Sequence, residues 1–542
     1  LGWQEPTGYI YAQWHFIRIT RVALQTMALS LLRLVAFVFL VSLPSLTTTV
    51  SQLTHGLEIM LLPFQRFGLP AHEIALVNMI ALRFVPTLVE ELEQVMKAQA
   101  SRGGEIGNLR LRQPIQLART LLPLVVPLFW HHHFGKVALA WSLAFLLPFA
   151  IAFGPAAAGA SLAHAAIAEY LPFIILLTAL FTVAGGIYLR GNLHGAPGMN
   201  TALLAIGAVL ASFMGTTGAS MLMIRPMIRA NDNRRHKVHL VVFFIFIVSN
   251  AGGSLTPLGD PPLFLGFLKG VDFFWTVQHI FPETLFLVGT LLALFFAIDS
   301  YWYRKEGVLP QDPTPDTRKF GIDGGINFLP LLVVVALVLM SGTWKPGIVF
   351  DVFGTPVELQ QLARDAGLIV VTLVSLAITP RRVRDDNEFS WAPMQEVAKL
   401  FIGIFLTMIP VLAMLKAGEA GAFAAVTRAV TGADGQPLPW AYFWFSGSLS
   451  SFLDNAPTYL VFFNTAGGDA AHLMGPLAST LAAISAGAVF MGANSYIGNA
   501  PNLMVKAIAE DRGVKMPSFF GYMAWSGGIL IPLFLLVTWI FF

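Results

Sequence analysis

Cysteine is absent from this chain of 542 residues, which excludes disulfides, thiolate chemistry and cysteine-ligated metal. Charge is scarce as well, because Asp, Glu, Lys and Arg together make up 12% of the residues while hydrophobic residues make up 56%. The mean hydropathy is +0.69. So few charges cannot cover the surface of a soluble protein, and we expect most of the chain to lie in a lipid bilayer.

Apolar runs recur along the whole chain. Several are close to the ~20 residues that a helix needs to cross the hydrocarbon core, and the shorter ones lie beside stretches rich in glycine and proline. The sequence therefore predicts an all-α polytopic membrane protein. The runs are residues 22–43, 137–153, 170–189, 201–223, 239–248, 284–298, 328–340, 367–379, 400–415, 441–463, 480–489 and 529–542.

The small positive charge does not indicate a nucleic-acid partner. The net charge is +3, but no basic face with interleaved aromatic residues appears. The basic residues fall instead in short hydrophilic gaps, which the positive-inside rule predicts to be cytoplasmic loops. These gaps hold Lys97, Arg102, Arg110 and Arg112; Arg225, Arg229, Arg234, Arg235 and Lys237; Arg304, Lys305 and Arg318; and Arg381, Arg382 and Arg384.

Two polar stretches inside the apolar sequence repeat one pattern. Residues 249–263 read SNAGGSLTPLGDPPL, and residues 491–503 read MGANSYIGNAPNL. Both are flanked by segments that otherwise read as membrane helices, which is how secondary transporters build a binding site from interrupted helices. The matching pairs are Gly253 with Gly492, Thr256 with Ser495, Gly259 with Gly498, Asp260 with Asn499, and Pro262 with Pro501.

A second pair of breaks precedes the first pair, one in each half of the chain. Residues 214–220 read MGTTGAS, and residues 453–458 read LDNAPT. Backbone groups freed by a break cost several kcal/mol in lipid, so the breaks must line a cavity enclosed by protein. Four breaks at equivalent places predict one shared cavity that holds a substrate and ions. The alternative is four ordinary kinks around no ligand.

Two carboxylates fall inside the predicted breaks, namely Asp260 and Asp454. A buried aspartate can hold sodium, or it can take a proton because burial disfavours the charged form. Each could instead cap the helix that follows it, since Asp before proline fits a helix start. Neutral oxygens would complete the coordination shell. They come from Asn250, Asn455, Asn494, Asn499, Thr216, Thr217, Ser220, Ser254, Thr256, Thr458 and Ser495.

Two further polar segments have simpler interpretations. His131, His132 and His133 are consecutive, so on a helix they spread apart and cannot easily converge on a metal ion. An interfacial position is the alternative that we favour. Residues 231–236 read NDNRRH and are most simply a cytoplasmic loop, with a gating role as the alternative.

From about residue 130 onward the chain resembles the sodium:proton antiporter and citrate-transporter-like branch of the ion transporter superfamily, which includes arsenite permeases and dicarboxylate carriers. Residues 215–220, 249–262, 454–458 and 492–502 carry the resemblance, and the string LGDPPLFLGF at 258–267 is specific to the antiporter-like branch. The resemblance implies inverted repeats, re-entrant hairpins and discontinuous helices, a homodimer, and a bacterial-type cytoplasmic (inner) membrane. Dicarboxylate carriers have Ser-Asn-Thr clusters at both breaks, whereas Asp260 makes this site more acidic and better suited to a cation.

The first part of the chain differs in texture and resembles the T component of energy-coupling-factor importers. Residues 69–73, 81–91 and 97–103 carry this second resemblance. It implies a truncated helical membrane domain with a cytoplasmic coupling helix. Residues 97–112 of this chain would contact ATPase subunits, and the helix tip at Ser101, Arg102 and Gly103 would dock on them. On sequence physics alone we favour a solvated connecting helix, and a partner-docking helix is the alternative. The family's second coupling motif is not found, and its first helices would precede Leu1.

The predicted organisation has four parts. They are a T-component-like domain at 1–129, a first transporter repeat at 130–300, a hydrophilic linker at 301–326 and a second repeat at 327–542. The join near residue 129 is either a gene fusion or an artefact of sequence assembly, because either family could supply the apolar string at 121–129.

The leading functional prediction is a sodium:proton antiporter that works by alternating access. It needs no cofactor and no metal beyond the transported sodium ion and proton. The alternatives are a sodium-coupled carboxylate or oxyanion carrier, and a subunit of an ATP-driven vitamin or metal importer. An enzyme is disfavoured, because the sequence has no nucleophile-base pair, phosphate loop or metal-ligand spacing.

Overall fold

The computed structural model describes residues 154–542 apart from 192, 308–320, 417–423 and 433–434, together with residues 10–14 and 17–20 and scattered positions between 136 and 151. The chain divides into two compact units, Leu1–Thr120 and Leu121–Phe542. In the first unit the described residues form one antiparallel hairpin, β1 (Ile10–Trp14) with β2 (Ile17–Thr20), which the sequence did not predict. The coupling helix and its tip at 101–103 lie outside the described residues, as do His131, His132 and His133.

The second unit is built almost entirely of helices. Seven of those described are long and apolar enough to cross a membrane, which confirms the predicted all-α polytopic membrane fold. The exposed apolar side chains on these helices, such as Leu332 and Leu373, fit a surface that faces lipid. The seven are Pro155–Gly185, Pro197–Met214, Trp275–Glu306, Gly325–Thr343, Leu359–Ile378, Ala392–Leu412 and Phe519–Phe541.

From Pro155 onward the first half has a helix that contains one π-helical turn, followed by a helical hairpin and an interrupted helix. The elements are α6 (Pro155–His164), η2 (Ala165–Tyr170), α7 (Leu171–Gly185), β3 (Tyr188–Arg190), α8 (Pro197–Met214), α9 (Thr216–Arg229), α10 (Val238–Ile247), η3 (Ala251–Gly253), α11 (Pro261–Leu268) and α12 (Trp275–Glu306).

A middle section connects the two halves. Its strands make two short antiparallel pairs, β3 with β4 and β5 with β6. The predicted linker at 301–326 begins within α12, which continues to Glu306. The elements are β4 (Gly321–Asp323), η4 (Gly325–Asn327), α13 (Phe328–Thr343), β5 (Val349–Val352), β6 (Thr355–Glu358), α14 (Leu359–Ile378), α15 (Arg381–Asp386) and α16 (Ala392–Lys416).

The second half repeats the order of hairpin, interrupted helix and long helix. Its elements are α17 (Ala424–Ala429), α18 (Pro439–Ser450), α19 (Asn455–Thr465), α20 (Ala470–Met474), α21 (Ala478–Met491), η6 (Gly492–Asn494), α22 (Ala500–Asp511) and α23 (Phe519–Phe541). Thus α8 and α9 correspond to α18 and α19, and α10 and α11 correspond to α21 and α22.

All four breaks fall where the sequence placed them. Gly215 separates α8 from α9 at a φ of 81°, a left-handed value that favours glycine. The second hairpin turns between Ser450 and Asn455. Between α10 and α11 the helix is replaced by η3 and an irregular segment, and between α21 and α22 by η6 and a similar one.

Connectivity places the two hairpins on opposite faces of the membrane. We call the face where α8 begins and α9 ends the first face. Five crossings follow the first hairpin, made by α10 with α11, then by α12, α13, α14 and α16. The second hairpin therefore starts from the second face with α18 and returns to that face with α19. The described basic residues of the gaps at 225–237, 304–305 and 381–384 therefore all lie at the first face, as the positive-inside rule expects of a cytoplasmic face.

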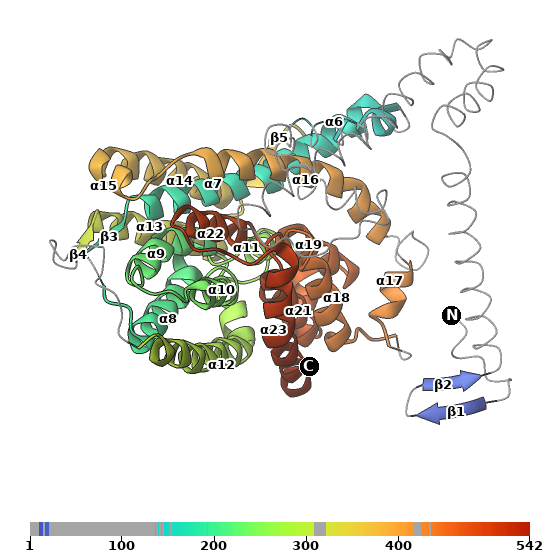
Figure 1. Cartoon of the computed structure of the whole chain (residues 1–542). Coiled ribbons are helices and arrows are strands. Elements are labelled where there is room, and N and C mark those ends of the chain that lie inside the picture. Colours follow the sequence, from blue (N-terminus) through green and yellow to red (C-terminus); the bar gives the residue numbers. More distant parts are fainter. Residues whose placement is uncertain are drawn as a thin grey trace, which may run out of the picture. The chain divides into compact units, whose positions relative to one another are not determined.

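Packing interleaves the two halves around the breaks. The half-helix α11 of the first repeat packs on α19 of the second, and α22 packs on α9 and α10. Figure 1 shows α11, α19 and α22 together among the surrounding helices. On one flank α7 contacts α9, and α16 contacts α19. The four breaks consequently meet in the interior of the second unit.

Candidate functional site

The hairpin α8–α9 touches the first interrupted helix at its tip. The backbone N–H of Thr216, the first residue of α9, donates to the carbonyl oxygen of Gly259 at 2.8 Å. The adjacent Thr216 hydroxyl donates to Asp260 Oδ1 at 2.9 Å. The break between α8 and α9 thus supplies two hydrogen-bond donors to the break between α10 and α11.

Asp260 lies at the centre of this arrangement and is almost fully buried, with 1% of its surface exposed. Besides Thr216, its carboxylate accepts from Asn455 Nδ2 of the second hairpin and from Asn499 Nδ2 of the second interrupted helix, the latter at 3.0 Å. The carboxylate of one break therefore accepts hydrogen bonds from residues of the other three breaks.

The alternative that Asp260 only caps α11 does not hold. Its backbone occupies the N-cap position, but its side chain makes no capping hydrogen bond. The next two residues, Pro261 and Pro262, have no backbone N–H to offer. The carboxylate points instead to the other breaks, and both of its oxygens accept hydrogen bonds from them.

Asn499 is the counterpart of Asp260 in the second repeat, and the two side chains contact each other. Asn499 Nδ2 also lies 3.2 Å from Asn250 Oδ1 and 3.0 Å from the carbonyl oxygen of Ser249. Equivalent positions of the two repeats thus form one pair, in which a single member carries charge.

Asp454 behaves differently from Asp260. It is half-buried, and its Oδ1 accepts from the backbone N–H of Ala456 at 3.1 Å, which makes it the N-cap of α19. The structure therefore agrees with the alternative that Asp454 caps the helix that follows it.

Replacing Asp454 should separate capping from charge. Asp454→Asn keeps a good N-cap, so we expect the stability to stay near that of the native chain and transport to persist. Asp454→Ala should lower the free energy of unfolding by about 1 kcal/mol. Thermal unfolding of detergent-solubilised protein measures the difference. Complete loss of transport in Asp454→Asn would instead assign the exchange to this carboxylate.

Several predicted hydroxyls brace the breaks. Thr256 donates to the carbonyl oxygen of Ser212, and its counterpart Ser495 donates to that of Ser451 at 2.5 Å. These two contacts occupy the same place in the two repeats. They tie each interrupted helix to the hairpin of its own repeat.

The remaining hydroxyls of the predicted shell pair away from Asp260. Ser220 lies 2.9 Å from the Ser249 hydroxyl, Ser254 lies 2.6 Å from that of Thr284, and Thr458 donates to the carbonyl oxygen of Asp454 at 3.0 Å. Thr217 is half-buried and lines the cavity described next.

A cavity of about 50 Å³ lies beside Asp260. One wall is formed by the tip of the α8–α9 hairpin, including Thr216 and Thr217, and the other by apolar side chains of α7 and α16, such as Leu180 and Val397. Among the described residues that line it, Asp260 alone is charged. The cavity thus combines one acidic residue and two threonines with an otherwise apolar lining.

Two buried amide oxygens at the breaks have no hydrogen-bond partner. Asn455 uses its Nδ2 on Asp260, while its Oδ1 is unpaired; Asn494 donates through Nδ2 to the Ser451 hydroxyl at 2.9 Å, while its Oδ1 is also unpaired. A buried acceptor without a partner is costly, on the order of 1–3 kcal/mol. A cation bound near the breaks could satisfy these oxygens.

Two buried residues belong to this network although the sequence-based shell omitted them. Asn502 donates to the carbonyl oxygens of Gly492 and Ser495, both at 2.9 Å, and accepts from Asn250 Nδ2 at 2.8 Å. Ser249 contacts Ser220 and Asn499. Asn502 lies one helical turn after Asn499, and this spacing is the signal that could have included it.

Interleaved hairpins and interrupted helices around one buried carboxylate define a polytopic membrane transporter. The chain belongs to the family CitMHS_2, described as "Putative citrate transport", whose model matches residues 114–542. The resemblance of the second part to citrate-transporter-like proteins is thereby confirmed.

The first part is similar to another transporter family. Residues 3–132 match CbiQ, "Cobalt transport protein". The energy-coupling factor transporter transmembrane protein EcfT of Acidaminococcus fermentans is 44% identical over 118 residues, which are 21% of this chain and 42% of that protein. The EcfT of Thermosediminibacter oceani is 49% identical over 98 residues, 18% of this chain and 36% of that protein.

The second resemblance is thus confirmed as well, although the chain spans less than half the length of these curated relatives. The two family matches overlap at residues 114–132. The predicted junction near residue 129 falls inside that overlap, and the limits of the four predicted parts stay predictions.

Proposed function

We propose that this transporter exchanges sodium ions for protons at Asp260. The observation that carries the proposal is a buried carboxylate whose described hydrogen-bonding partners, Thr216, Asn455 and Asn499, are all neutral. A charge at membrane depth is expensive without a counter-ion. A sodium ion or a proton would neutralise that charge. The two would compete, because binding of one to the carboxylate weakens binding of the other.

The neutral oxygens around the breaks suit a hard cation. Sodium favours carboxylate, amide and backbone carbonyl oxygens, which interrupted helices present. The unpaired Oδ1 atoms of Asn455 and Asn494 are of this type. Asp260 with these amides would form the cation site. Asn499 and Thr216 would hold the carboxylate in place, and Asn250 would hold Asn499.

Alternating access would expose Asp260 to one face at a time. The cavity beside Asp260 lies between the hairpin tip and the apolar helices α7 and α16, so a shift of the hairpin against α7 would change its opening. We propose that sodium leaves as a proton arrives, at the bacterial-type cytoplasmic membrane, in a homodimer.

A carboxylate carrier is the second candidate. The family description favours it, and so do the four helix starts at the breaks, since helix N-termini attract anions. Against it stands the negative charge of Asp260, which would repel a carboxylate in the same cavity.

Proteoliposomes test the proposal. The full chain is reconstituted with a pH-sensitive dye inside and the membrane voltage clamped, and sodium chloride is added outside. We expect the lumen to become more alkaline, because sodium enters as protons leave, with choline chloride as the control. Sodium-dependent uptake of radiolabelled citrate without a pH change would favour the carboxylate carrier, and no response to any cation or carboxylate would overturn both.

The first part suggests a role in an ATP-driven importer. Its EcfT relatives are components of energy-coupling factor transporters by name, and we propose that residues 97–112 could contact ATPase subunits. Affinity purification of the chain from its host would then recover ATPases. Deleting residues 1–129 should abolish their recovery but leave sodium-driven proton movement intact.

A further inference from the structure

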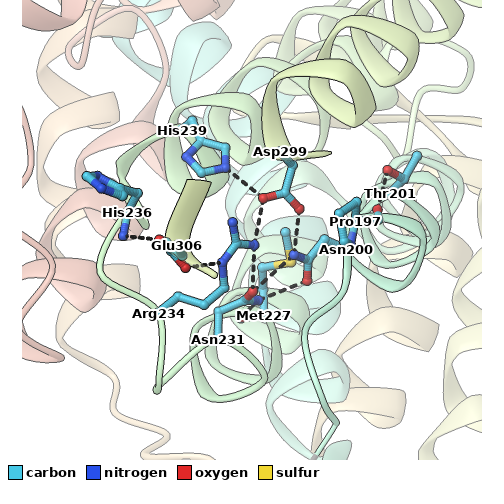
Figure 2. A network of polar contacts seen from close by, with 10 residues as sticks. All are labelled: Pro197, Asn200, Thr201, Met227, Asn231, Arg234, His236, His239, Asp299 and Glu306. Carbon is cyan, nitrogen blue, oxygen red and sulfur yellow. Dashed lines mark hydrogen bonds and ion pairs between the residues drawn. The ribbon is translucent and has the colours of Figure 1, made fainter. Parts of the chain in front are cut away.

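A second buried polar cluster lies outside the site, at the first face. Its centre is Asp299 of α12, whose side chain is completely buried. Figure 2 shows three side chains that converge on it. Asn200 Nδ2 lies 2.8 Å from Asp299 Oδ2, and Arg234 Nη1 and His239 Nε2 lie 2.6 Å and 2.8 Å from Oδ1.

The three partners come from three different segments. Asn200 is in the first turn of α8, Arg234 is in the segment that follows α9, and His239 is in the first turn of α10. The chain therefore passes Asp299 on entering the hairpin, on leaving it, and on entering the interrupted helix.

Asn231 joins the two ends of the hairpin directly. Its Oδ1 accepts from Asn200 Nδ2 at 3.0 Å, its Nδ2 donates to Asn200 Oδ1 at 2.9 Å and to the carbonyl oxygen of Met227 in α9 at 2.8 Å (Figure 2). Arg234 also pairs with Glu306 at the end of α12, through Nε at 3.3 Å. The simple cytoplasmic loop expected at 231–236 is thus partly interior, with Asn231 and Arg234 buried.

The segments held by Asp299 are those that carry the site. The tip of the hairpin carries Thr216, which donates to Asp260. The helix α10 leads to Asn250, which contacts Asn499 and Asn502. A helix is stiff along its axis, so fixing the base of α8, α9 and α10 constrains the position of their inner ends. The α8 helix spans about 27 Å at 1.5 Å per residue.

We propose that Asp299 is a positioning residue, which anchors the base of the α8–α9 hairpin through Asn200 and Arg234 and so holds Thr216 against Asp260. The inference rests on the proposed function only for its transport consequence, because the position of the hairpin tip can be measured by itself.

The absence of cysteine makes that measurement direct. A single Thr217→Cys reporter at the cavity-lining tip is labelled with a membrane-permeant maleimide in the full chain in nanodiscs. We expect Asp299→Asn to raise the labelling rate about tenfold by loosening the tip. The double variant Asp299→Asn with Arg234→Gln also removes the guanidinium that Asp299 pairs with, and it should keep the raised rate because the anchor is still absent. A return to the rate of the reporter alone would assign the effect to the buried charge of Arg234 and would contradict the anchor.

Two further variants keep the test decisive if Asp299→Asn folds poorly. Asn200→Ser shortens the link to α8 without changing any charge, and we expect a smaller rise in the same direction. Asp351→Asn, at an exposed residue of β5, is the matched control and should leave the rate unchanged. Unchanged labelling in folded Asp299→Asn and Asn200→Ser proteins overturns the anchor, whether or not the chain exchanges sodium for protons.

Transport adds a second readout when sodium exchange is observed. A displaced Thr216 weakens the hold on the ionised form of Asp260, so Asp299→Asn should raise the KM for sodium more than it lowers kcat. Equal loss of kcat and kcat/KM with normal labelling would assign Asp299 to the transport cycle itself and would contradict a positioning role.

Discussion

Replacing Asp260 with asparagine should abolish sodium-driven proton movement while leaving the fold intact. The substitution removes the only charge among the described residues lining the cavity, so neither a proton nor sodium has a carboxylate to bind. We expect a loss of at least ~100-fold, equivalent to about 2.7 kcal/mol of lost stabilisation. The measurement is the sodium-driven pH change in proteoliposomes, with sodium binding by calorimetry as a second readout.

The surroundings of Asp260 can accept an amide. A new Nδ2 would face the donor of Asn455, but Asn455 can rotate its amide and present its Oδ1, which has no partner in the native chain. Thr216 and Asn499 can still donate to the remaining oxygen. The unfolding temperature should therefore stay close to that of the native chain, so lost transport would not reflect unfolding.

Asp351→Asn is the control, because it removes an aspartate from an exposed strand and should transport normally. Undiminished sodium exchange in the Asp260→Asn protein would contradict the proposed mechanism. Sodium-dependent citrate uptake that survives the substitution would transfer the assignment to the carboxylate carrier.

The position of the breaks was predictable because their causes are local. The backbone at Gly215 has a left-handed φ that favours glycine, and Pro261, Pro262 and Pro501 are well suited to the first turn of a helix. These requirements are written in the residues themselves. The four breaks could therefore be placed without knowing what packs around them.

The separate roles of Asp260 and Asp454 could not be predicted, because both precede a helix start and both fit a cap. The difference depends on distant residues. Asn499 reaches Asp260 from 239 positions away, whereas Asp454 bonds two residues along the chain. The same reason hid the burial of Arg234, whose partner Asp299 lies in another helix.

The pairing of Asp260 with Asn499 gives the site one charge where symmetry would give two or none. Two aspartates in contact would repel each other, and two asparagines would leave no group to take a proton. One of each gives this pair a single negative charge, which the proposed exchange would balance with either a sodium ion or a proton.

The glycines of the interrupted helices should be the most sensitive apolar positions in the site. A Cβ on Gly259 would lie 2.1 Å from the carbonyl oxygen of Gly253, and one on Gly498 would lie 2.5 Å from that of Gly492. Backbone atoms cannot move aside as a flexible side chain can. Each break must therefore open to relieve the contact, which costs about 1–3 kcal/mol.

Gly259→Ala and Gly498→Ala should each lower the unfolding temperature in detergent and abolish sodium exchange, since Asp260 and Asn499 directly follow the displaced residues. Gly289→Ala in α12 is the matched control, because its Cβ would meet no atom within 4 Å and alanine favours a helix by about 1 kcal/mol. Its protein should be as stable and active as the native chain. If Gly498→Ala proved harmless while Gly259→Ala did not, the close packing of the second break would have no part in transport, and the charge-bearing first repeat would hold the ion alone.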